Sequence, residues 1–130
     1  MSFQSFFQKN NILVYNNNDF NFSIWIPHTN DRLWILENNN YILSFRLDLK
    51  NFSKWLKKSL LSKESKKLTQ KCTAVCITDD VKLNYEIEIL LSKENGCFRN
   101  LIFNDNNAFY AKQMPIRSLN AIADSLLTLV

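Results

Sequence analysis

The 130-residue chain contains one glycine, Gly96, and one histidine, His28. A single glycine cannot build the glycine-rich loops that cradle nucleotide phosphates. A single histidine excludes histidine-based catalytic triads and metal sites with several histidine ligands. The sequence therefore predicts no catalytic residue, no metal site and no cofactor, and we expect a chain that is not an enzyme.

Cysteines and long apolar segments are also scarce. Three cysteines make no disulfide framework, and Cys72 and Cys76 lie too far apart along an expected strand to bridge. All three are expected to be buried. The apolar runs are strand-sized, so no membrane span is expected, and the N-terminus does not resemble a signal peptide. These absences predict a reducing compartment, either the cytoplasm or a nucleoid or organelle matrix.

Apolar and aromatic residues are plentiful by contrast. Hydrophobic residues make up 46% of the chain and aromatic residues 13%, which is enough for one packed core. We expect residues 1–130 to form a single domain. Eighteen asparagines take the place of glycine in the expected turns, because asparagine tolerates left-handed backbone conformations.

Positive charge is concentrated in one segment. The net charge is +4, and eight of the sixteen lysines and arginines lie between Lys50 and Lys71, where Glu64 alone opposes them. Such clustering favours a polyanionic partner, although the solvated face of a helix explains the same pattern equally well.

The two halves of the chain resemble each other. Residues 32–40 (RLWILENNN) resemble residues 99–107 (RNLIFNDNN), which lie 67 positions later. The match continues at this offset into two amphipathic segments. A self-match at half the chain length indicates a duplicated structural unit. We place the first repeat at residues 10–67 and the second at residues 72–130.

Hydrophobic periodicity gives both repeats the same order of elements. Apolar alternation predicts strands over residues 12–15, 20–26, 32–37 and 41–47, and again over 72–78, 85–91, 98–103 and 108–114. Asp48 is suited to cap a helix with an apolar stripe through Leu60, and Pro115 to start a second helix that runs to Val130. Residues 62–71 are predicted to be helix end and linker. The predicted fold is α+β, with two ββββα repeats whose antiparallel four-stranded sheets are each followed by an amphipathic helix and pack together.

This tandem ββββα order resembles the single-stranded nucleic-acid-binding group that includes the Pur-alpha repeat domains and the Whirly proteins. The resemblance rests on element order and repeat length, since the Lys-Gly-Lys-Ala motif of Whirly proteins is absent. It implies binding of single-stranded DNA or RNA on the exposed sheet surface, without catalysis. Dimeric coactivators with one such unit per chain look similar, which leaves a homo-oligomer open.

Single-strand binders combine cationic tracks with aromatic platforms on which bases stack. Trp25, Arg46 and Phe109 are expected on the strand face opposite the apolar stripe, and Arg32 and Arg99 begin equivalent strands of the two repeats. The basic helix and the second sheet supply further cations. The predicted nucleic-acid contacts are Trp25, Arg32, Arg46, Lys54, Lys57, Lys58, Lys82, Arg99, Phe109 and Lys112.

A protein partner remains the alternative. Outward apolar residues could equally form a protein interface, namely Trp25, Ile35, Leu90 and Ile102. Glu86 and Glu88 are expected on the open face of the second sheet, where they would repel phosphates. The chain would then be an inhibitor, immunity protein, chaperone or assembly subunit, and a subunit of an enzyme without its own active site is not distinguished from these.

Overall fold

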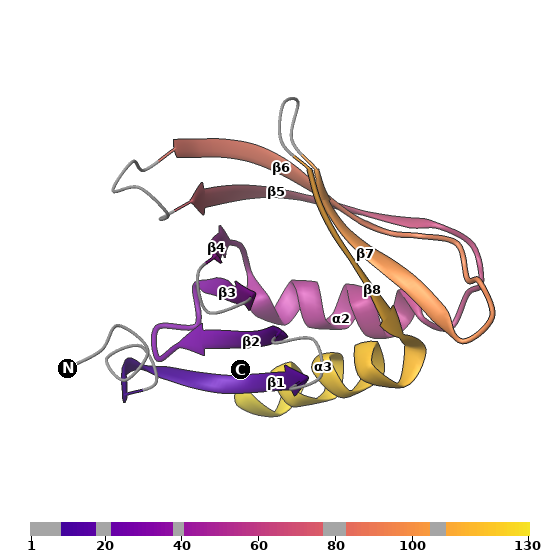
Figure 1. The fold of residues 1–130 in the computed structure, drawn as a ribbon, viewed down its shortest axis with the longest axis horizontal. Helices are drawn as coiled ribbons and strands as arrows, with labels where there is room; N and C mark the ends of the chain where they lie inside the picture. The colour runs from indigo at the N-terminus through magenta and orange to yellow at the C-terminus, as the bar shows by residue number, and fades with distance from the viewer. Residues whose placement is uncertain (1–8, 18–21, 38–40, 77–82, 105–108) are drawn as a thin grey trace.

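The computed structural model describes residues 9–17, 22–37, 41–76, 83–104 and 109–130 (Figure 1). Its strands and helices follow in the order β1 (Asn11–Asn17), β2 (Phe22–Pro27), β3 (Arg32–Glu37), β4 (Tyr41–Arg46), α2 (Leu49–Ser59), β5 (Lys66–Cys76), β6 (Leu83–Leu91), β7 (Phe98–Asn104), β8 (Phe109–Pro115) and α3 (Ile116–Leu129). The predicted α+β class is confirmed. Neither helix is long and apolar enough, within these ranges, to cross a lipid bilayer.

The strands pair antiparallel in the order β1 to β8. The first half is joined to the second by the β4–β5 ladder, which runs from Leu43 opposite Cys76 to Arg46 opposite Thr73. The prediction of two separate four-stranded sheets is therefore corrected to one continuous ladder. In the view of Figure 1, the long β7–β8 hairpin runs obliquely to β1, β2 and β3.

Strand β5 begins six residues earlier than the sequence pattern indicates. Lys66, Lys67 and Leu68 pair with residues 89–91 of β6, and Leu68 is buried in the core. The register then shifts between Leu68 and Cys72. A single apolar residue within a lysine-rich stretch gives no measurable periodicity, so the sequence favoured a linker where the chain forms an extended strand.

The core is one cluster built from both halves of the chain. Phe22, Ile24 and Ile26 point to it from β2, and the two helices add apolar stripes that include Phe52 and Leu119. Ile35, expected to face outward, is 2% exposed because its cross-strand partner is the core residue Ile24. The remaining members are Leu33, Leu47, Leu49, Leu56, Leu68, Ile89, Leu91, Leu101, Phe103, Met114, Ile122, Ala123 and Leu126.

Polar contacts fix the helices against each other and against the sheet. The Asp48 carboxylate accepts a hydrogen bond from the Asn51 backbone N–H at 3.0 Å and caps α2 as predicted. The Lys57 ammonium lies 2.9 Å from Asp124 of α3. The Tyr15 hydroxyl of β1 donates to the Ser118 hydroxyl of α3 at 3.1 Å. Both helices are thus held on the core side of the sheet.

The sequence match between the halves does not hold in phase along β3 and β7. At an offset of 67, buried Leu33 falls on Asn100 and half-buried Arg32 falls on buried Arg99, so the two strands would present opposite faces. The segment after β3 comprises residues 38–40, whereas the segment after β7 comprises 105–108, one residue more. Side chains alternate between the two faces along a strand. The one extra residue therefore turns each side chain of β7 to the face opposite that of its sequence match in β3. The helices stay in phase, with Phe52 matched to Leu119.

Candidate nucleic-acid interface

The outward face of β2, β3 and β4 carries two tryptophans and two arginines. Leu33 and Ile35 point into the core, so alternation along β3 places Arg32 and Trp34 on the opposite face. Trp25 of β2 is the cross-strand partner of Trp34, which puts their Cβ atoms about 5 Å apart. Both indoles are partly exposed to solvent.

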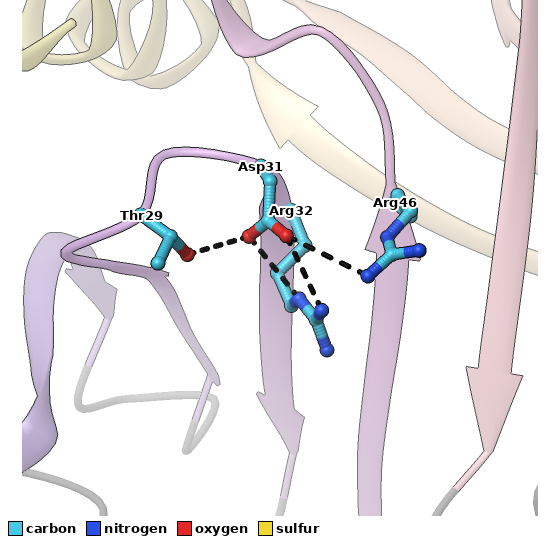
Figure 2. A network of polar contacts seen from close by, with 4 residues as sticks. All are labelled: Thr29, Asp31, Arg32 and Arg46. Atoms are coloured by element: carbon cyan, nitrogen blue, oxygen red, sulfur yellow. Dashed lines mark hydrogen bonds and ion pairs between the residues drawn. The ribbon is translucent and has the colours of Figure 1, made fainter.

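The two arginines lie side by side and share one carboxylate (Figure 2). Arg32 and Arg46 are cross-strand partners. Arg32 donates from Nε to Asp31 Oδ1 and from Nη2 to Asp31 Oδ2, both at 3.3 Å, and Arg46 Nη2 lies 3.7 Å from Asp31 Oδ2. Thr29 donates its hydroxyl to Asp31 Oδ1 at 2.7 Å. One carboxylate thus lies between two guanidinium groups and leaves the cluster with one net positive charge.

Electrostatics keep this carboxylate ionised. Hydrogen bonds from Arg32 and then Thr29 lower the pKa of Asp31 below its ordinary value, and partial burial opposes them. The Arg32 guanidinium also lies 5.9 Å from the Trp34 ring centroid, within cation–π range. Arg32 therefore contacts both the Asp31 carboxylate and the Trp34 ring, so the charged and aromatic side chains of this face are adjacent.

Three of the residues predicted to contact nucleic acid lie together on this face. They are Trp25, Arg32 and Arg46, and the side chain of Arg46 is 64% exposed. Sequence reasoning missed Trp34 and Asp31. The signal for Trp34 was available, because it stands two positions after Arg32 in an expected strand and must share its facing.

Arg99 was predicted to contact nucleic acid, but it is 2% exposed and points into the interior. Its Nε donates to the Ser92 carbonyl at 2.8 Å and its Nη2 to the Glu64 carbonyl at 2.7 Å. Its Nη1 donates to the carbonyls of Ser62 at 2.6 Å and Ser59 at 3.3 Å. Burial lowers the pKa of Arg99, with Glu94 opposing the shift. Arg99 holds the end of α2 in place and does not belong to the interface.

Lys112 was also predicted to contact nucleic acid, yet it lies at the margin of the core. Its ammonium is 2.7 Å from Glu37 Oε1 of β3 and 5.0 Å from the ring centroid of Phe22 in β2. Its side chain is only 20% exposed. Because Met114 on the same strand face is buried in the core, Lys112 points between the two halves rather than outward.

The lysines of α2 form a second positive surface, away from the tryptophans. Lys54 and Lys58 are exposed, and Lys57 is engaged with Asp124 and with Asn120 at 3.2 Å. The opposite side of α2 packs into the core against the inner face of the sheet. The exposed lysines therefore point away from the side of the sheet that carries Trp25.

The structure describes the other predicted residues only in part. Lys82 lies outside the described residues, as do the side chains of Phe109 and Glu86. Glu88 is exposed and forms an ion pair with Lys67. Cys97, expected to be buried, is an exposed free cysteine in the loop before β7. Across the described ranges, no three His, Cys, Asp or Glu side chains gather into a metal-binding group.

No protein-family model matches this chain, and neither a curated protein nor a solved structure shows significant similarity to it. The residues of the sheet face and their geometry are therefore the basis for proposing a function.

Proposed function

We propose that this protein binds single-stranded nucleic acid, DNA or RNA, on the outward face of β2–β4, without catalysing a reaction. The observation that carries the proposal is the pairing of Trp25 with Trp34 next to the paired arginines Arg32 and Arg46. Flat rings stack on unpaired bases, and guanidinium groups bind phosphate oxygens.

The spacing of these groups supports this ligand. Two indoles on neighbouring strands offer two stacking positions. The two arginines lie next to them on the same face, because Arg32 contacts the Trp34 ring and pairs with Arg46. Bases in a duplex are already stacked and paired, so they cannot reach such a platform without unpairing. The arrangement thus favours a single strand over a duplex.

The ββββα–ββββα order supports a second part of the proposal, that the two halves descend from one unit like that of the Pur-alpha and Whirly group. On this proposal the halves have diverged, with the slip between β3 and β7 as one mark of divergence. The tryptophan pair belongs to the first half. We propose that the second half supports the binding face rather than duplicating it.

The test is retention of a labelled oligothymidylate at low salt, with a duplex of the same length as comparison. We expect the single strand to bind more tightly, and its affinity to fall steeply as salt is raised, because bound arginines release counterions. Exchanging both Trp25 and Trp34 for leucine should weaken binding by more than tenfold, since stacking contributes about 1–3 kcal/mol per base.

The matched control is Lys54→Gln with Lys58→Gln, which removes two exposed charges from α2. Under the proposal this variant loses only the long-range attraction, so it weakens binding less than the tryptophan exchange does. Wild-type protein that retains no oligonucleotide at low salt would remove the proposed function. If the lysine variant loses binding and the tryptophan variant keeps it, the binding site lies on α2.

A protein interface is the second candidate, favoured by the outward face of the second half. Leu90 pairs with Ile102, and Ile102 pairs with Ala111, giving a row of partly exposed apolar residues across β6, β7 and β8. Such a row suits a protein partner or a second copy of the chain. A dimer in sedimentation equilibrium that Ile102→Asp dissociates, together with absent oligonucleotide binding, would favour this candidate.

A further inference from the structure

The Asp31 cluster suggests how the ligand phosphate is received. In the free protein, the guanidinium groups of Arg32 and Arg46 both lie beside the carboxylate of Asp31 (Figure 2). A carboxylate and a phosphate present the same feature to arginine, namely a pair of anionic oxygens that accept charge-assisted hydrogen bonds. The position between the arginines is therefore built for an anion.

We propose that Asp31 occupies the position that a nucleic-acid phosphate takes in the complex, and so competes with the ligand from within the chain. The inference rests on the proposed function. It adds a phosphate subsite between Arg32 and Arg46 and a residue that limits affinity at that subsite.

The geometry allows this exchange. Arg46 is mostly exposed and lies 3.7 Å from Asp31, farther than Arg32 at 3.3 Å. Ion pairs of this exposure are weak, so a phosphate can displace the carboxylate from Arg46 first. Thr29 holds the other oxygen, Oδ1, and keeps Asp31 in place when Oδ2 is released.

The alternative role for Asp31 is positioning, in which it holds the arginines ready for the ligand. The two roles predict opposite signs. As a competitor, Asp31 weakens binding, and Asp31→Asn strengthens it. As a positioning residue, Asp31 supports binding, and the same substitution weakens it.

The experiment measures oligothymidylate affinity for wild type and for Asp31→Asn across a range of salt concentrations. We expect Asp31→Asn to tighten binding about two- to fivefold, the range that an exposed ion pair of this kind represents. The salt dependence should steepen as well, because each further phosphate neutralised on a single strand adds about 0.7 to the slope.

Asp124→Asn is the matched control, because it removes one exposed carboxylate from an ion pair with Lys57 on the other side of the molecule. Net charge rises equally in both variants. A second control repeats Asp31→Asn in a protein that carries Arg32→Gln and Arg46→Gln, where the proposal predicts no tightening. Thermal unfolding of each variant confirms that it is folded.

Three results would overturn the proposal while leaving the proposed function in place. They are weaker or unchanged binding by Asp31→Asn, equal tightening by Asp124→Asn, and tightening that persists without the two arginines. Wild-type protein that binds no oligonucleotide would remove the proposed function, and the phosphate subsite with it.

Discussion

Arg99 shows how one buried charge can organise a region of this fold. It donates to four backbone carbonyls from three segments, at the end of α2, in the connection to β5 and after β6. The Ser59 carbonyl belongs to the last turn of α2, where the partial negative charge of the helix end attracts a cation. Without the guanidinium, the buried Ser59 carbonyl and the three part-buried carbonyls would each lose a hydrogen-bond donor.

We predict that Arg99→Met lowers the free energy of unfolding by about 3 kcal/mol, as expected when a buried hydrogen-bonding charge is removed from its partners. Arg99→Lys should recover only part of this loss, because one ammonium cannot span carbonyls that a planar guanidinium reaches in several directions. Urea unfolding monitored by circular dichroism measures both.

Arg117→Lys is the control for the arginine exchange, since Arg117 is exposed and its replacement should change stability by less than about 0.5 kcal/mol. If Arg99→Lys proves as stable as wild type, the directional hydrogen bonds of Arg99 are not what holds the end of α2.

The residues of the candidate interface were predictable where strand alternation alone decides facing. Trp25 could be placed because Phe22, Ile24 and Ile26 mark the buried side of its strand. The position of Arg99 could not be predicted, because an arginine in a strand is normally interpreted as a surface cation. Its partners are carbonyls of the segments around 59–64 and 92, and sequence alone does not show that these approach β7.

At the scale of elements, β3 and β8 meet although they are far apart in the strand order. Lys112 of β8 reaches Glu37 of β3, where Phe22 lies beneath the same ammonium. The sheet therefore bends back on itself, and this ion pair joins its two halves at the edge of the core. Its side chains are 20% and 25% exposed, so solvent screens it less than a pair at the surface.

We predict a coupling free energy of about 1 kcal/mol between Glu37 and Lys112 in a double-mutant cycle of Glu37→Gln and Lys112→Met. Chemical denaturation of the four proteins supplies the measurement. The Lys67–Glu88 pair is the comparison, because both of its side chains are about half exposed and its coupling should be clearly smaller. Equal coupling free energies in the two cycles would mean that the partial burial of the Glu37–Lys112 pair does not strengthen it.

The elements also show where periodicity succeeds and where it ends. Within the described residues, the order of strands β1 to β8 and of helices α2 and α3 followed from alternation, turn clusters and the Asp48 cap. The early start of β5 did not, since Leu68 is one apolar residue among lysines. Nor did the β4–β5 ladder, because strand pairing across an intervening helix depends on the packing of α2.

At the scale of the whole molecule, the two halves carry different surfaces on one sheet. The outward face of the first half has paired tryptophans and arginines, whereas that of the second has Leu90, Ile102 and the Lys67–Glu88 pair. The exposed lysines of α2 form a third surface, on the helix side. We propose that a single strand binds the first of these surfaces.

Tryptophan fluorescence can show whether a bound single strand contacts Trp25 and Trp34. The chain has three tryptophans, and Trp55 of α2 packs beside Phe52 with ring centroids 5.9 Å apart. Trp55→Phe leaves Trp25 and Trp34 as the emitters. Titrating this variant with oligothymidylate at low salt should quench the emission strongly, because on this proposal bases stack on the two partly exposed indoles. Removing either remaining tryptophan should abolish part of the quenching and weaken the affinity. Binding that leaves the emission of Trp25 and Trp34 unchanged would show that the strand does not stack on this face.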